Sequence, residues 1–115
     1  MSDSTQNLAA SEEERRRHMR YRLRESIRIH SKGGRHAAVA HDISISGLSA
    51  STSHSMRIDE EVCLVPVVGE QLEAIVRHKT EDVYGFEFLS VPPKVEEAIH
   101  ALCKGLFPLR GTDNI

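Results

Sequence analysis

The chain has 115 residues, of which 39% are hydrophobic and 28% are charged, and its formal net charge is −2. This composition is ordinary for a soluble globular protein, and the length allows one domain with a modest core but excludes two. No apolar run approaches the length of a membrane span, about 18 residues, and the start MSDSTQNLAASEEE contains no signal-peptide core. We therefore expect a cytoplasmic protein.

Positive charge is concentrated near the N-terminus. Residues 15–24 contain six arginines and no acid, while the remaining nine basic residues are set against all 17 acidic residues of the chain. An acidic body with one basic patch predicts a small anionic ligand at that patch. It argues against a broad nucleic-acid surface, so we expect no nucleic-acid partner.

Two strands are predicted after a polar N-terminal segment. Residues 1–13 lack periodicity, which predicts a disordered tail. Apolar and polar residues then alternate, and the first strand is predicted over residues 21–31. After a turn signal at 31–34, the second strand is predicted over residues 36–45. Its apolar side chains fall at odd positions: Val39, Ile43 and Ile45.

The apolar residues of both strands are odd-numbered, which restricts the register of the hairpin. Residues that lie opposite each other in an antiparallel pair share a face, so paired numbers must add to an even value. A two-residue turn at 33–34 breaks this rule, and we predict a three-residue loop with a bulge. This register places Ser44 opposite residues 22–24 and Gly47 beside residues 19–21. The hairpin therefore brings the arginine-rich segment to the serine and the glycine.

Four further strands complete the predicted sheet. Their alternating apolar side chains indicate residues 48–52, 62–68, 71–78 and 83–89. Pro66 restricts its strand to a sheet edge or a bulge. Six short strands separated by tight turns predict a closed or nearly closed antiparallel barrel.

A helix is predicted at the C-terminal end. It begins at Pro92-Pro93, where a missing backbone donor costs nothing, and ends at Gly105 or Pro108. Its apolar side chains form one stripe: Val95, Ala98, Ile99, Leu102 and Leu106. We expect the helix to lie across one mouth of the barrel, followed by a loose tail over residues 108–115.

Two short motifs stand near the predicted hairpin junction. The first is Arg16-x-x-x-Arg20, and the second is Asp42-x-Ser44-x-x-Gly47. Side chains two residues apart on a strand point to the same face, which would place the Asp42 carboxylate beside the Ser44 hydroxyl. Gly47 allows the backbone to bend or to approach a ligand closely.

These motifs, in this order and followed by the predicted strands and helix, resemble the PilZ domain family, the bacterial receptor module for cyclic di-GMP. The resemblance covers roughly Glu14 to Leu106. It includes the stretch Tyr84–Phe88, YGFEF, which is similar to the last barrel strand of the family. It implies an all-β, six-stranded antiparallel PilZ-like barrel with a C-terminal α-helix packed on it, in a PilZ domain spanning residues 14–107.

The resemblance also implies a function. It implies a stand-alone receptor that binds cyclic di-GMP, is not an enzyme and needs no cofactor. Such a receptor relays the second-messenger signal to an effector protein of motility, exopolysaccharide production or secretion.

Roles for individual residues follow from the same resemblance. Arg16, Arg17 and Arg20 are implied to contact phosphate and base, since guanidinium groups bind phosphate and the O6 and N7 acceptors of guanine. Arg15 precedes the motif, at a position that in the family influences whether one or two nucleotides bind.

The second motif is implied to contact the other edge of the base. There the Asp42 carboxylate can accept from guanine N1–H and N2–H₂, and the Ser44 hydroxyl can donate or accept nearby. Gly47 is implied to have a steric role.

Other interpretations of these residues stay open. Asp and Ser near a turn often cap neighbouring backbone groups, and a strand glycine often marks a bulge. The chain is alternatively a PilZ-like protein–protein interaction module without nucleotide binding, or a small barrel that binds RNA or single-stranded DNA. The latter would need aromatic stacking platforms, and aromatic residues make up only 4% of the chain.

No catalytic or metal-binding set is apparent in the sequence. The seven histidines contain no H-x-x-x-H pair, although His30 and His36 flank one hairpin turn and are candidates to approach each other. Cys63 and Cys103 form no C-x-x-C pair, and we expect two buried thiols rather than a disulfide. Apolar surroundings would raise their pKa values. We therefore predict neither an enzyme nor a metal site.

Overall fold

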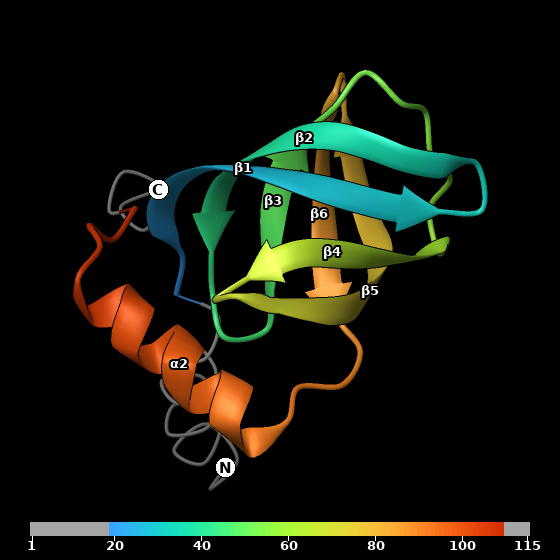
Figure 1. The fold of residues 1–115 in the computed structure, drawn as a ribbon. Coiled ribbons are helices and arrows are strands. Elements are labelled where there is room, and N and C mark those ends of the chain that lie inside the picture. The colour runs from blue at the N-terminus through green and yellow to red at the C-terminus, as the bar shows by residue number, and fades with distance from the viewer. Residues whose placement is uncertain (1–18, 110–115) are drawn as a thin grey trace, which may run out of the picture.

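The computed structural model describes residues 19–109, which form a closed antiparallel barrel of six strands and one helix (Figure 1). The elements are β1 (Tyr21–Ser31), β2 (Gly34–Ile43), β3 (Gly47–Ser51), β4 (Glu61–Val67), β5 (Glu70–Thr80), β6 (Val83–Phe88) and α2 (Pro93–Lys104). The strand order around the barrel is β1-β2-β3-β6-β5-β4, and β4 pairs back to β1. The predicted barrel with a C-terminal helix is confirmed. The tail predicted over residues 1–13 lies outside the described residues.

The core is formed by the side chains that alternate toward the inside of the barrel. On β6, Tyr84, Phe86 and Phe88 are buried, whereas Val83 and Glu87 are exposed. The pleat of a strand sends successive side chains to opposite faces, so this pattern is the one that the apolar alternation predicts. Residues on the outer face of β5 and β6 are therefore available to line a surface site.

The β1–β2 hairpin differs from its predicted form. Ser31 pairs with Gly34, so the loop has two residues rather than three, and Gly34 has a φ of 120°. The register then shifts within the strands, between Arg22 and Glu25 of β1. A bulge of this kind adds one residue to one strand. On the turn side of the bulge, odd-numbered Ile27 of β1 pairs with even-numbered Ala38 of β2 and both are buried, so the rule that paired numbers add to an even value fails there.

The buried face of β2 also differs from the prediction. Ala38 and Ala40 are buried, whereas Val39 is 39% exposed. A register shift against β3 just after Ala40 returns Ile43 to the core. Ile43 is the last residue of β2, so Ile45 lies in the following loop and is only half-buried. Small alanine side chains fill the inner face of β2. The pattern of larger apolar residues in the sequence did not predict this.

Helix α2 lies beside the barrel, at the end that carries the β2–β3 loop (Figure 1). It follows Pro92 and is capped by Gly105, as the sequence predicts. Its buried side chains, Val95, Ile99 and Cys103, belong to the same hydrophobic cluster as the barrel core. Burial raises the pKa of the Cys103 thiol. In residues 19–109, no helix is both long and apolar enough to cross a membrane.

Strand β4 contains two residues singled out in the sequence. The register shifts between Leu64 and Val67, so Pro66 lies at an irregularity. β4 pairs with both β1 and β5, so the bulge is confirmed and the sheet-edge alternative is wrong. Cys63 is half-exposed rather than buried, because it alternates with the inward-pointing residues on either side of it.

Candidate functional site

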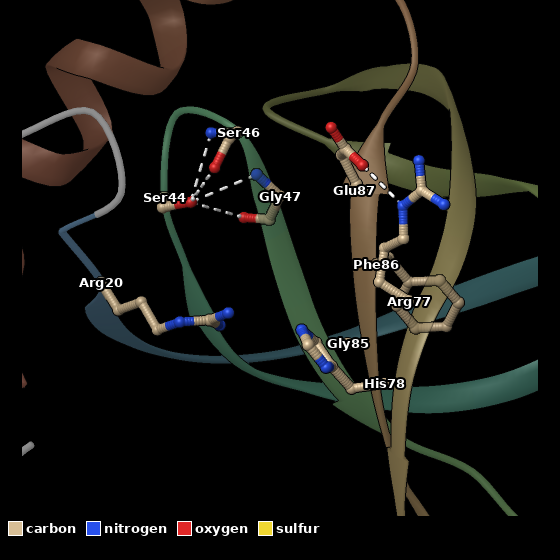
Figure 2. A pocket seen from close by; sticks show the side chains of 9 residues that line it. All are labelled: Arg20, Ser44, Ser46, Gly47, Arg77, His78, Gly85, Phe86 and Glu87. Carbon is tan, nitrogen blue, oxygen red and sulfur yellow. Dashed lines mark hydrogen bonds and ion pairs between the residues drawn. The ribbon is translucent and has the colours of Figure 1, made fainter. Parts of the chain in front are cut away.

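A cavity of about 270 Å³ lies where the β2–β3 loop meets β5 and β6 (Figure 2). Its lining residues come from four parts of the chain: Arg20, Ser44, Ser46, Gly47, Arg77, His78, Gly85, Phe86 and Glu87. Three residues predicted from the motifs thus line one cavity. The predicted Arg15, Arg16 and Arg17 lie outside the described residues.

The hairpin brings Arg20 to the second motif, although at a different register from the predicted one. Tyr21 pairs with Ile43, so Arg20 continues the ladder next to Ser44. The predicted pairing of Ser44 with residues 22–24 is wrong, because the bulge in β1 and the shorter loop move the register. The two motifs meet in either register, because the predicted three-residue loop and the observed two-residue loop both place the start of β1 beside the end of β2.

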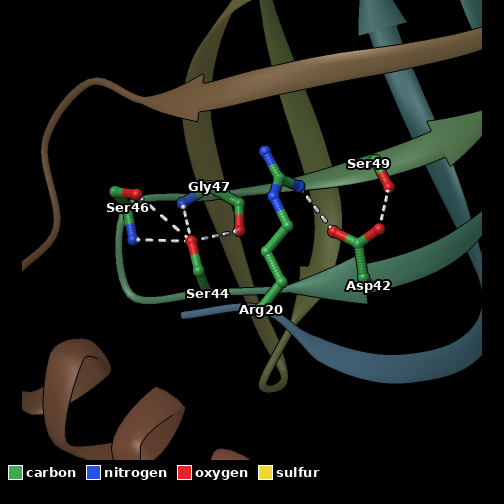
Figure 3. Close-up of polar contacts among 6 residues, drawn as sticks. All are labelled: Arg20, Asp42, Ser44, Ser46, Gly47 and Ser49. Carbon is green, nitrogen blue, oxygen red and sulfur yellow. Dashed lines mark hydrogen bonds and ion pairs between the residues drawn. The ribbon is translucent and has the colours of Figure 1, made fainter. Parts of the chain in front are cut away.

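Arg20 is held by the C-terminal segment through its backbone and by Asp42 through its side chain. Leu109 N–H donates to the Arg20 carbonyl over 2.9 Å. Arg20 Nη1 lies 2.6 Å from Asp42 Oδ1 in an ion pair (Figure 3). The side chains are 43% and 14% exposed, respectively, so Arg20 faces solvent and Asp42 lies deeper.

The Asp42 carboxylate has a second partner that the sequence analysis missed. The Ser49 hydroxyl on β3 donates to Asp42 Oδ2 over 2.6 Å (Figure 3). Asp42 pairs with Ser49 across β2 and β3, and Ser49 is buried. The two carboxylate oxygens are thus oriented by different groups. The register shift in β2 creates this pairing, and neither residue spacing nor alternation indicates it.

Ser44 closes the β2–β3 loop. Its hydroxyl accepts from the backbone N–H groups of Ser46 and Gly47, each over 3.2 Å, and its own N–H donates to the Gly47 carbonyl over 2.8 Å. Ser44 is only 3% exposed. Ser44 lies after the end of β2. The prediction that it shares a strand face with Asp42 is therefore wrong. The local-capping interpretation of Ser44 is confirmed, because its hydrogen bonds hold the loop that forms one wall of the cavity.

Gly47 is required by the barrel itself. It pairs with Glu87 of β6, and a Cβ atom added at Gly47 would overlap the Phe86 carbonyl oxygen. Its φ is not in the left-handed region, so the reason for glycine is the close approach of two strands. This approach places the β2–β3 loop against the β6 residues that line the cavity.

The wall formed by β5 and β6 was not predicted as part of the site. Arg77 Nε donates to Glu87 Oε1 over 2.7 Å, and Arg77 Nη1 donates to Asp59 Oδ1 over 3.0 Å. The hydrogen bond to Glu87 is the main cause of a raised Arg77 pKa, against a smaller lowering by desolvation. Arg77 and Glu87 alternate with predicted core residues, which identifies them as outward-facing but does not connect them to the motifs.

The histidines form no metal site among residues 19–109. These residues contain no group of three or more histidine, cysteine or acidic side chains placed to hold a metal ion. His36 does not pair with His30; its ring stacks on His54, with 3.4 Å between centroids. In the β1–β2 ladder His36 lies opposite Ile29, whereas His30 lies opposite Arg35.

Comparisons with known proteins place the chain in a family. The family model of the PilZ domain matches residues 14–105. Among solved structures, the chain is similar to the PilZ domain of CeSA from a cellulose-synthesizing bacterium, with 18% identity and a TM-score of 0.58. That alignment covers 75% of this chain and 95% of the other. A search of curated proteins gives no match.

Two longer proteins contain a similar fold. The Borreliella burgdorferi PlzA protein, solved in complex with c-di-GMP, aligns with 15% identity and a TM-score of 0.65, over 85% of this chain and 45% of that one. The Bacillus subtilis inhibitor of motility, MotI/DgrA, aligns with 17% identity and a TM-score of 0.62, over 87% of this chain and 52% of that one. This chain spans about half the length of each. These similarities show the fold, and the family model matches most of the sequence: the chain belongs to the PilZ domain family.

Proposed function

We propose that the chain is a non-enzymatic, cytoplasmic receptor that binds cyclic di-GMP in the cavity beside Arg20. The observation that carries the proposal is the ion pair, 2.6 Å long, between Arg20, which lines the cavity, and Asp42, which does not line it but lies directly behind Arg20. The pair combines a cationic donor at the cavity with an anionic acceptor next to it. PilZ membership and the c-di-GMP complex of PlzA support the choice of ligand.

The chemistry of guanine matches this pair. Guanidinium donates to phosphate oxygens or to the O6 and N7 acceptors, and carboxylate accepts from N1–H and N2–H₂. In this proposal Arg20 contacts phosphate and base, and Asp42 contacts the base once the ligand competes for Arg20. Ser44 shapes the loop and Gly47 permits the close packing of that loop on β6. Arg15, Arg16 and Arg17 complete the cationic side of the site.

The bound nucleotide then passes the signal to an effector protein. Arg20 and the start of β1 are joined by backbone hydrogen bonds to the segment after α2, since Leu109 N–H donates to Arg20 O and Arg22 N–H donates to Phe107 O. Phe107 is 80% exposed. A ligand that repositions Arg20 therefore acts on the residues at the start of β1, which are hydrogen-bonded to this exposed segment. We assign the effector to motility, exopolysaccharide production or secretion on family grounds.

Calorimetric titration with cyclic di-GMP, with GMP and cyclic AMP as controls, tests the proposal. We expect saturable binding of cyclic di-GMP alone. Arg20→Ala should weaken it by about tenfold or more, because a charge and a bidentate contact are lost together. Arg35→Ala is the matched control, since Arg35 is exposed at the start of β2 and does not line the cavity.

Two results would contradict the proposal. Wild-type protein that does not bind cyclic di-GMP would favour the interaction-module alternative. Equal affinities of the wild type, Arg20→Ala and Arg35→Ala for cyclic di-GMP would show that the nucleotide does not bind in this cavity.

A further inference from the structure

We infer that Arg77 and Glu87 form a second guanine-reading pair, so that the two bases of cyclic di-GMP are read by two arginine–carboxylate pairs, of which Arg20, Arg77 and Glu87 line one cavity. The inference rests on the proposed function of the cavity. Figure 2 shows Arg20 entering from one side of the site, and the bonded Arg77 and Glu87 on the other.

The second pair is built by neighbouring strands. Arg77 comes from β5 and Glu87 from β6, and the register between these strands shifts between Val76 and His78. This irregularity turns both Arg77 and His78 toward the cavity. The Arg77 and Glu87 side chains are 45% and 50% exposed, so a ligand can reach them without unfolding of the barrel.

The geometry of the second pair resembles that of the first. Arg77 Nε lies 2.7 Å from Glu87 Oε1, and Arg20 Nη1 lies 2.6 Å from Asp42 Oδ1. A guanidinium has five N–H donors, and the bonds from Arg77 to Glu87 and Asp59 use two of them. The Asp59 contact holds the guanidinium plane, while other donors stay available for O6 and N7 of a base.

The chemistry of the pair selects guanine over adenine. Guanine presents acceptors to the guanidinium and N1–H and N2–H₂ donors to the carboxylate, whereas adenine places an amino donor where guanine has O6. The pair carries no net charge, so it does not add to the attraction of the phosphates. Its contribution is therefore discrimination between bases rather than a general gain in affinity for anions.

A hybrid nucleotide separates the two reading sites. The experiment is calorimetric titration of wild type, Glu87→Ala and Glu73→Ala with cyclic di-GMP and with cyclic GMP–AMP of the same phosphodiester linkage. Glu73 is the matched control because it is an exposed glutamate of β5 outside this cavity. Both ligands carry the same charge, so the electrostatic effect of removing a carboxylate cancels in the ratio of their affinities.

We expect wild type to prefer cyclic di-GMP over the hybrid by about tenfold, the value of one discriminated base edge. Glu87→Ala should reduce this preference to within about twofold, since the hybrid can place its single guanine at Arg20 and Asp42. Glu73→Ala should keep the wild-type preference. Arg77→Lys, which retains the charge but loses the planar donors, should reduce the preference as Glu87→Ala does.

The outcomes distinguish this inference from the proposed function. Binding of cyclic di-GMP by the wild type, with an unchanged preference in Glu87→Ala and Arg77→Lys, would overturn the second reading pair and leave the proposed function intact. Equal affinities of the wild type for both nucleotides would likewise overturn the second reading pair and leave the proposed function intact. A wild type that binds neither overturns the proposed function, and the inference with it.

Discussion

Ser49 donates a hydrogen bond of 2.6 Å to the same carboxylate that forms the ion pair with Arg20, that of Asp42. The two contacts occupy different oxygens, so Arg20 can leave Oδ1 for a ligand while Ser49 continues to hold Oδ2. Ser49, a residue outside both motifs, thereby orients the Asp42 carboxylate at the proposed binding site.

Ser49→Ala should therefore weaken cyclic di-GMP binding by roughly tenfold, the lower end of the range for one hydrogen bond to a charged group. The matched control is Ser51→Ala on the same strand, whose hydroxyl lies 2.8 Å from His41 Nε2 instead. Calorimetry measures affinity, and urea unfolding of both variants measures the loss of stability. Equal affinities of the two variants would show that Ser49 supports β3 alone.

Base selectivity tests the role assigned to Asp42. Adenine lacks the N1–H and N2–H₂ donors that a carboxylate accepts, so cyclic di-AMP should bind the wild type far more weakly than cyclic di-GMP. Asp42→Ala should reduce the difference in affinity between the two nucleotides, mainly by weakening the binding of cyclic di-GMP. Competition of both nucleotides for one fluorescent cyclic di-GMP derivative measures the ratio. Comparable wild-type affinities for the two nucleotides would exclude base-edge reading by Asp42.

Features that depend on local alternation were predictable from the sequence. The strands containing Leu72 and Phe86, the helix bearing Val95, and the meeting of Arg20 with Asp42 all follow from periodicity and turn signals. A hairpin is a local structure, and its two ends must meet whatever the details of its register.

Features that depend on bulges and on distant strands were not predictable. The register shifts after Arg22 of β1 and after Ala40 of β2 leave no mark in residue type, and the buried side of β2 changes between Ala40 and Ile43. The Arg77–Glu87 pair joins the motif cavity only because Gly47 pairs with Glu87 in the β3–β6 ladder. That pairing is a consequence of the closed strand order, in which β6 follows β3 around the barrel.

Gly47→Ala should destabilise the fold before it affects any ligand contact. The added Cβ would overlap the Phe86 carbonyl oxygen, and backbone of a paired strand cannot move aside as a side chain can. Overpacking of this kind costs about 1–3 kcal/mol or more. Gly105→Ala is the control, since its Cβ would lie 3.7 Å from the nearest atom, Leu102 O, in ordinary contact. Urea unfolding should show a loss for Gly47→Ala that far exceeds that for Gly105→Ala; similar values would contradict the steric argument.

The two cysteines should differ in reactivity. Cys103 is buried in the cluster between α2 and the barrel, whereas Cys63 is half-exposed on the outer face of β4. A thiol reagent should modify Cys63 in the native protein and Cys103 only on unfolding. The single-thiol variants Cys63→Ser and Cys103→Ala assign each reaction. Rapid native modification of Cys103 would show that α2 opens readily from the barrel.

The buried thiol should also make stability depend on alkaline pH. Burial raises the pKa of Cys103, so above the ordinary thiol value of about 8.5 the unfolded chain loses a proton that the folded chain retains. The folded state then binds more protons than the unfolded state, and the free energy of unfolding falls as pH rises above that value. Below it both states hold the proton, and this contribution is constant. The measurement compares urea midpoints at neutral pH and near pH 9.5 for wild type and Cys103→Ala, because other titrating groups affect both equally. Wild type should lose more stability than the variant over this range, and parallel losses would show that the Cys103 thiol titrates alike in the folded and unfolded chains.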